Sequence, residues 1–128
     1  MVTSELPKFP SGAAARPNIL MFDDASFVRT VSEEQRLRFD KFLSSNSDTL
    51  ENVVVLEIGA GTNFPGIRIL SESVASFFSR KRNKTTSTLI RVNPRDPSLD
   101  FSVKRANFVS VHTGALAAIS SFNKCLKS

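Results

Sequence analysis

The segment with the clearest chemical potential is a glycine turn, Glu57 to Thr62 (EIGAGT), between an apolar run and a helical pattern. Glycines permit positive φ and let a ligand approach the backbone, because no Cβ stands in the way. The N–H groups and partial positive charge at the start of the following helix suit phosphate or ribose oxygens. The turn lacks the third glycine of the dinucleotide fingerprint, where this chain has Phe64. It therefore indicates a nucleotide site, and a tight turn serving only the fold is the alternative.

The same turn resembles the first motif of Rossmann-like methyltransferases, which begins E-x-G-x-G as residues 57–61 do here. That family places another glycine at the position of Asn63. It also places an acid at the end of the next strand, where it holds both ribose hydroxyls of S-adenosylmethionine. Here the next strand ends in Asn93, and the first acid, Asp96, follows a proline. Methyl transfer is therefore kept as the alternative function.

The other residues with reactive side chains have simpler structural interpretations. His112 is the only histidine, whereas zinc needs three or four ligands and a general base needs an orienting partner. The pair Asp23-Asp24 is better explained by hydrogen bonds to loop N–H groups than by a paired-carboxylate site. The basic run of residues 80–84 complements a helix end. A single cysteine, Cys125, excludes an internal disulfide and a cysteine-rich zinc site, and it favours a reducing, intracellular compartment.

Alternating apolar segments must position these residues. The patterns predict strands at residues 18–22, 53–58, 88–92 and 108–111. They predict helices after a capping box at residues 32–35, over residues 67–78, and from residue 113 or 114 to 126. This order is typical of an α/β fold whose mostly parallel sheet carries helices on its faces. Because ligands bind at the carboxyl ends of such strands, function is expected at residues 23–24, 59–62 and 93–95.

Composition sets the broad class. The 128 residues suffice for one domain, and 41% apolar with 23% charged residues is globular composition. The formal charge of +5 is an ordinary solubility margin, so nucleic acid is not an expected partner. No apolar run of about 18 residues is present, so no membrane partner is expected either. Residues 1–17, which are rich in Pro, Gly, Ala and Ser, are expected to form an irregular lead-in to a domain at 18–128.

Four segments, taken together, resemble the C-terminal half of the Rossmann domain of sirtuins. ARPNILMF (residues 15–22) resembles the segment with which sirtuins re-enter that sheet. EIGAGTNFPGIR (residues 57–68) is similar to a GAGT-x-x-P-x-x-R turn of a divergent sirtuin-like branch. LIRVNPRD (residues 89–96) resembles the strand that ends in an adenosine-contacting Asn. Gly114-Ala115-Leu116 stands where the last loop of the family closes over the adenine.

The resemblance implies a partial Rossmann-like sheet from an NAD-dependent protein deacylase, with NAD as cofactor and no zinc. In this interpretation the amide of Asn93 and the backbone N–H groups of residues 60–62 pair with ribose hydroxyls, and the Thr62 hydroxyl adds another donor and acceptor. The implied adenosine cradle consists of Gly59, Ala60, Gly61, Thr62, Asn93, Pro94, Arg95 and Leu116.

The departures from the family concern catalysis. The glycine-rich loop that grips the pyrophosphate, and the histidine general base, belong to the half expected before residue 15. Asp23 replaces a glycine beside the peptide-binding strand, which counts against acyl-peptide binding. No catalytic residue is therefore assigned, and NAD is expected to bind weakly or together with an N-terminal sirtuin-like half as partner. A methyltransferase portion and a non-catalytic interaction module are the alternatives.

Overall fold

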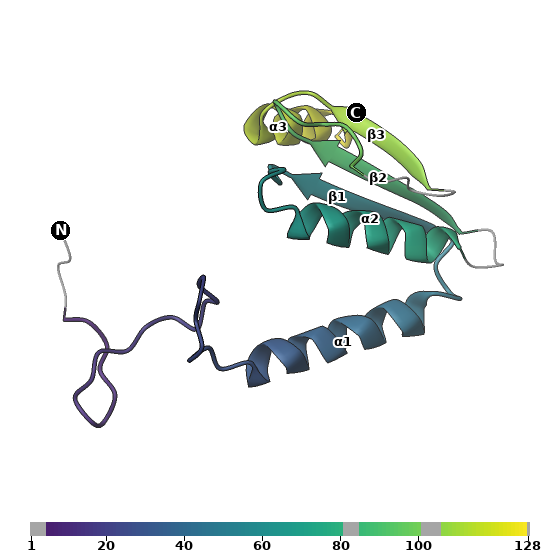
Figure 1. Ribbon diagram of the computed structural model, residues 1–128. Helices are drawn as coiled ribbons and strands as arrows, with labels where there is room; N and C mark the ends of the chain where they lie inside the picture. The colour runs from purple at the N-terminus through teal and green to yellow at the C-terminus, as the bar shows by residue number, and fades with distance from the viewer. Residues whose placement is uncertain (1–4, 81–84, 101–105, 128) are drawn as a thin grey trace. The chain divides into compact units, whose positions relative to one another are not determined.

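A computed structural model describes residues 5–80, 85–100 and 106–127 (Figure 1). The chain divides into two compact units, Met1–Lys41 and Phe42–Ser128. The sequence placed the start of the domain at residue 18, whereas the second unit begins at Phe42. All of the strands lie in this second unit, within the described residues.

The prediction of a strand at residues 18–22 is wrong. These five residues have no regular secondary structure, and their apolar side chains are exposed. The Ile19 N–H donates to the Pro17 carbonyl in a local turn instead of to a neighbouring strand. An apolar run forms a strand only when a neighbouring strand pairs with its backbone N–H and C=O groups. The following Asp23 has a φ of 56°, in the left-handed region that Asp tolerates better than most residues.

The first helix, α1 (Thr30–Asn46), confirms the predicted helix but not its predicted cap. Ser32 lies inside the helix, where its hydroxyl donates to the Arg29 carbonyl, so it does not cap the N-terminus. None of the residues of α1 is buried. Its apolar side chains Leu37, Phe39 and Phe42 are exposed.

The second unit contains a three-stranded parallel sheet of β1 (Asn52–Ile58), β2 (Thr86–Val92) and β3 (Asn107–Val111), in that spatial order. Helix α2 (Gly66–Ser79) packs against β1 and β2, and helix α3 (Ala115–Cys125) follows β3 (Figure 1). The three valines of β1 favour a strand because β-branched side chains fit a pleated surface. The predicted α/β fold with a parallel, partly Rossmann-like sheet is confirmed.

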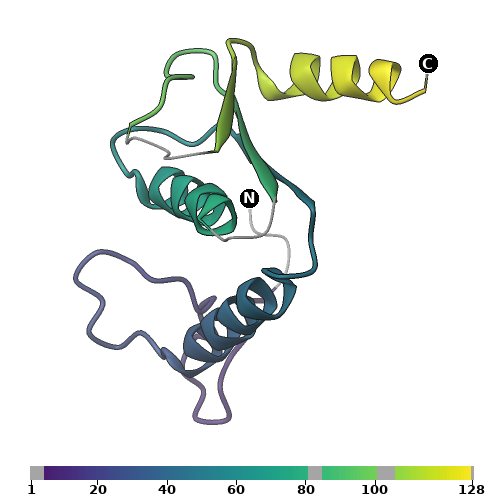
Figure 2. The same cartoon turned by 90° about the vertical axis from the view of Figure 1, so that its right-hand side faces the viewer.

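One face of the sheet is covered by α2, and the other face is closed only at its carboxyl end, where Val92 of β2 is 1% exposed. Leu89 of β2 is fully buried with Ala75 and Phe78 of α2. On the opposite face, the β1 side chains Val54 and Leu56 are 63% and 49% exposed. Helix α3 does not cover that face, because Ala118 is its one buried residue and the helix leads away from the end of β3 (Figure 2). The core of the unit is therefore the layer between α2 and the sheet.

Two leucines of neighbouring strands test this one-sided core. Leu89→Ala is expected to lower the free energy of unfolding by about 2–5 kcal/mol, because it opens a cavity under α2. Leu56→Ala is expected to cost about 1 kcal/mol or less, because that side chain is half exposed. Urea unfolding followed by circular dichroism measures both. Equal losses would show that the outer face of the sheet is covered.

Candidate functional site

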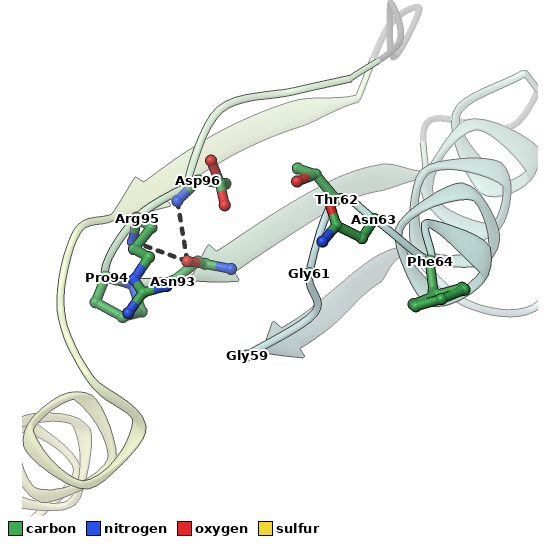
Figure 3. Close-up of a pocket in the computed structure, with 9 residues that line it drawn as sticks. All are labelled: Gly59, Gly61, Thr62, Asn63, Phe64, Asn93, Pro94, Arg95 and Asp96. Atoms are coloured by element: carbon green, nitrogen blue, oxygen red, sulfur yellow. Dashed lines mark hydrogen bonds between the residues drawn. The ribbon is translucent and has the colours of Figure 1, made fainter.

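An open pocket of about 590 Å³ lies at the carboxyl ends of β1 and β2 (Figure 3). One wall is the turn after β1, and the other is the turn after β2. Adjacent parallel strands deliver their carboxyl ends to the same edge of the sheet, and the register pairs Ile58 with Val92 at that edge. The residues that line the pocket are Gly59, Gly61, Thr62, Asn63, Phe64, Asn93, Pro94, Arg95 and Asp96.

Glycine is required at the start of the first wall. Gly59 has a φ of 71°, which strains any residue with a Cβ. In this conformation its N–H donates to the Val92 carbonyl at 2.9 Å, which ties the end of β1 to the end of β2. Gly61 has no positive φ and no atom within 4 Å of the place that a Cβ would take. It therefore keeps space open in the pocket without being required by the backbone.

Asn93 joins the two walls. It is buried, and its Nδ2 donates to the Ala60 carbonyl at 2.9 Å. Its Oδ1 accepts the N–H groups of Arg95 and Asp96, each at 2.9 Å (Figure 3). An amide oxygen has two lone pairs, so its acceptor capacity is used, whereas one N–H remains available. The two strand ends thus converge as the sequence predicted, but the amide of Asn93 already serves as the connection between them.

The structure brings most of the expected cradle together. Gly59, Gly61 and Thr62 form one wall and Asn93, Pro94 and Arg95 the other, while Ala60 turns its carbonyl toward Asn93. Leu116 is not among the lining residues, because it lies in the first turn of α3 and is 80% exposed. The sequence did not predict the lining residues Asn63, Phe64 and Asp96, although Asn63 and Asp96 directly follow predicted residues and Phe64 follows Asn63.

His112 contributes to the pocket indirectly. Its Nε2 lies 2.5 Å from the Pro94 carbonyl oxygen, so this nitrogen must carry the proton. The Asn93 N–H donates to the Val111 carbonyl in the same stretch of β3. The end of β3 and His112 therefore hold the backbone of the turn after β2 in place. This agrees with the structural role that the sequence predicted for His112.

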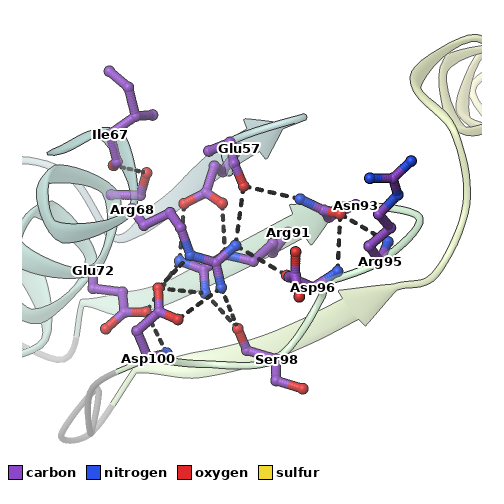
Figure 4. A network of polar contacts seen from close by, with 12 residues as sticks. Glu57, Ile67, Arg68, Glu72, Arg91, Asn93, Arg95, Asp96, Ser98 and Asp100 are labelled. Atoms are coloured by element: carbon purple, nitrogen blue, oxygen red, sulfur yellow. Dashed lines mark hydrogen bonds and ion pairs between the residues drawn. The ribbon is translucent and has the colours of Figure 1, made fainter. Parts of the chain in front are cut away.

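A buried network of charges lies behind the pocket (Figure 4). Its centre is Arg91 of β2, whose guanidinium is fully buried and donates two hydrogen bonds to Glu57 of β1, at 2.6 and 2.9 Å. The same guanidinium donates to Glu72 of α2 at 3.0 Å and to the Ser98 carbonyl. Arg91 therefore connects both strands, the helix and the segment after β2. The ring of Phe108 in β3 lies 6.0 Å from the guanidinium carbon.

A second buried arginine, Arg68 of α2, connects the glycine turn to the same segment. It donates from Nη1 to the Ala60 and Asp96 carbonyls at 3.1 and 2.9 Å, and from Nη2 to Ser98 at 2.9 Å. It also pairs with the carboxylate of Asp100. The network contains two cations and three anions, because Glu57, Glu72 and Asp100 face Arg68 and Arg91.

This network changes the interpretation of two motif residues. Glu57 begins the methyltransferase-like pattern, and Arg68 ends the sirtuin-like one. Neither lines the pocket, since both side chains point into the network behind it (Figure 4). Nothing in a short sequence window distinguishes a buried pair of charges from a binding residue, because charged side chains are usually exposed. The available signal was a charged residue inside each of two apolar runs, Glu57 in VVVLEI and Arg91 in TLIRV, with opposite charges.

A second pocket, of about 510 Å³, lies in the first unit and offers fewer groups for binding. Of its polar residues, Arg16 is paired with Asp24, and the Asn18 amide donates to the Val28 carbonyl. Within the described ranges, no group of three or more His, Cys, Asp and Glu side chains is arranged to hold a metal ion. No helix in the described part of the chain is long and apolar enough to cross a membrane.

Comparison with protein-family models, with curated proteins and with solved structures finds no match to this chain. The pocket and the network are therefore the features of the chain that bear on its function.

Removing the central cation tests the network. Arg91→Ala is expected to lower the free energy of unfolding by about 3–5 kcal/mol, because it leaves Glu57 and Glu72 buried without their partner. As a control, Arg36→Ala removes an exposed helical pair with Asp40, 3.8 Å apart, and is expected to cost about 0.5 kcal/mol or less. Guanidinium unfolding measures both. Similar losses for the two variants would show that Arg91 is accessible to water.

The pKa of Asp100 gives a pH test. The hydrogen bond from Arg68 lowers this pKa below its ordinary value of 3.8, although partial burial opposes the shift. A lowered folded-state pKa contributes stability above the ordinary value, and that contribution is lost as the pH falls through the lowered pKa. Asp100→Asn should therefore cost most at neutral pH, and its deficit relative to the unmodified chain should shrink below about pH 4. Unfolding series from pH 7 to pH 2.5 measure this, and a constant deficit would contradict it.

Proposed function

We propose that the second unit binds the adenosine side of NAD and is one portion of a sirtuin-like NAD-dependent protein deacylase. The observation that supports this proposal is the meeting of the Gly59–Thr62 turn and the Asn93–Arg95 turn at a single pocket. A βαβ unit with a glycine turn after its first strand is the usual frame for a nucleotide at the carboxyl ends of the strands.

The hydrogen-bonding groups of the pocket fit a nucleoside phosphate. The N–H groups of Ala60, Gly61 and Thr62 have no protein partner among the residues that the structure describes. They are donors, and α2 begins just beyond them at Gly66 with a partial positive charge. The Thr62 hydroxyl and the remaining side-chain N–H of Asn93 are further hydrogen-bond donors in the pocket. Ribose oxygens and phosphate oxygens are acceptors of the kind that this wall requires.

In our proposal this chain binds NAD but does not catalyse deacylation. The only histidine, His112, is bonded to the Pro94 carbonyl, so it is not available as a general base in that position. The partner we propose is a polypeptide with the first half of such a domain, which supplies the pyrophosphate loop. Its apolar surface would cover the exposed face of β1, formed by Val54, Leu56 and Ile58. Both partners would meet inside the cell.

The alternatives receive different support. A methyltransferase portion is less well supported, because the residue directly after β2 is Asn93 and not an acid, and Glu57 is committed to Arg91. A non-catalytic interaction module is supported by the uncovered face of β1. The test must therefore distinguish NAD, S-adenosylmethionine and no cofactor.

Gly61→Ala tests the proposal without altering the backbone. A methyl group at this position meets no protein atom within 4 Å, but it takes space beside the ligand. The unmodified chain is expected to bind ADP-ribose and NAD in isothermal titration, and Gly61→Ala to weaken both by about tenfold or more. The melting temperature should not change.

The matched control is Gly66→Ala, which adds the same methyl group into open space outside the lining residues. It is expected to leave both affinities unchanged. Binding of S-adenosylmethionine in place of NAD would favour the methyltransferase alternative. Binding of neither cofactor, both by the chain alone and with an N-terminal sirtuin-like half supplied, would favour the interaction module and would remove the proposed function.

A further inference from the structure

We infer that the carboxylate of Asp96, and not the amide of Asn93, binds the ribose of the adenosine and makes the pocket select a free 2′ hydroxyl. The inference rests on the proposed function, because it assumes that the pocket takes an adenosine. It adds a specificity-determining residue to that site. The carboxylate accepts a hydrogen bond from the 2′ hydroxyl and repels a 2′ phosphate, so NAD is preferred over its 2′-phosphorylated form.

The amide of Asn93 is already used by the protein. This residue occupies the first position after β2, and its oxygen accepts the N–H groups of Arg95 and Asp96. Its Nδ2 donates to the Ala60 carbonyl. No acceptor of this side chain is left for a ribose hydroxyl, although one N–H is left as a donor. A residue other than Asn93 must therefore accept the hydrogen bond of a ribose hydroxyl in this part of the pocket.

The carboxylate of Asp96 is an acceptor that the protein leaves open. The backbone of this residue is held in place, because its N–H donates to Asn93 and its carbonyl accepts from Arg68. Its side chain is exposed and lines the pocket, and among the described residues it makes no hydrogen bond or ion pair. Figure 3 shows the carboxylate on the side of its turn that faces Thr62. A nucleotide held by the N–H groups of the glycine turn thus presents its ribose to Asp96.

A carboxylate matches the donors that a ribose offers. The 2′ and 3′ hydroxyls are neighbouring donors, and an ionised carboxylate accepts hydrogen bonds at both of its oxygens. A hydrogen bond to a charged acceptor contributes more than one between neutral groups. The glycine turn supplies N–H donors on the opposite wall, so the two walls together distinguish the phosphates of a nucleotide from its ribose hydroxyls.

The neighbouring arginine does not reverse this preference. In βαβ nucleotide sites, an acid near the end of the second strand accepts from the ribose 2′ hydroxyl, and a nearby arginine accommodates a 2′ phosphate. This chain has both residue types, as Asp96 and Arg95, and both line the pocket. The Arg95 guanidinium points away from Asp96 (Figure 4). A 2′ phosphate beside Asp96 would bring two anions together, which costs binding free energy.

Two pairs of probes test the inference on the full chain, alone and with an N-terminal sirtuin-like half supplied. 5′-ADP and 2′-deoxy-5′-ADP differ by the 2′ oxygen alone, and NAD and NADP differ by the 2′ phosphate alone. Isothermal titration is expected to show the ligand with the free 2′ hydroxyl binding at least about tenfold more tightly in each pair.

Two substitutions of Asp96 separate its charge from its hydrogen bond. In Asp96→Ala both affinity ratios should fall to about one, because the acceptor and the charge are lost together. Asp96→Asn keeps an acceptor and loses the charge. It should bring the ratio of the NAD and NADP affinities to about one, while a preference for 5′-ADP over 2′-deoxy-5′-ADP remains.

The control variant is Asp23→Asn, which removes the same charge at an exposed position of the first unit, where Asn also tolerates the positive φ. It is expected to keep both ratios of the unmodified chain. Equal or reversed affinities within either pair, or unchanged ratios in Asp96→Ala, would overturn the inference and leave the adenosine site standing. Failure of all four probes to bind, with and without the N-terminal half, would overturn the proposed function as well.

Discussion

The second unit depends on the pairing of two buried arginines with three carboxylates. Arg68 and Arg91 are 1% and 0% exposed, so each must find its hydrogen bonds inside the protein. A buried ion pair contributes little net stability, but a buried charge without its partner is very costly. The arrangement that satisfies Arg91 must therefore bring together Glu57 of β1, Glu72 of α2 and the Ser98 carbonyl. This requirement orders residues 96–100, which belong to no helix or strand.

The same requirement separates the groups behind the pocket from those that face it. The carboxylates of Glu57, Glu72 and Asp100 pair with the two arginines, and the Ala60 carbonyl accepts from Arg68 and Asn93, whereas Asp96 lines the pocket. Backbone N–H groups of the glycine turn and the guanidinium of Arg95 remain on the pocket side. The N–H donors of the glycine turn suit a ligand rich in oxygen acceptors, while the other wall carries both a cation, Arg95, and an anion, Asp96. The electrostatics of the pocket thus follow from how the interior satisfies its own polar groups.

The one-sided sheet gives the unit its second distinctive property. Helix α2 and the segment after β2 both lie on the face toward which Arg91 points, so the other face keeps Val54, Leu56 and Ile58 exposed. β1 also forms an edge of the sheet, and its sequence NVVVLEI contains no proline or lysine. Such edges favour pairing with another chain. The pocket and the exposed face share β1, so a partner that covers this strand lies beside the site.

The sequence by itself determined β1, β2, β3, α2, α3 and the glycine turn, because β-branched runs, 3.6-residue periodicity and glycine act locally. The same kind of signal was insufficient for the strand predicted at residues 18–22, since an apolar run does not specify a partner strand. It was also insufficient for placing Leu116 in the pocket, because helix α3 packs little of its surface. Only the tertiary structure decided that Glu57 and Arg68 belong to the interior and that Asn93 joins the two walls. Their partners lie 8 to 34 residues away along the chain, and such pairings depend on which buried group needs a hydrogen bond.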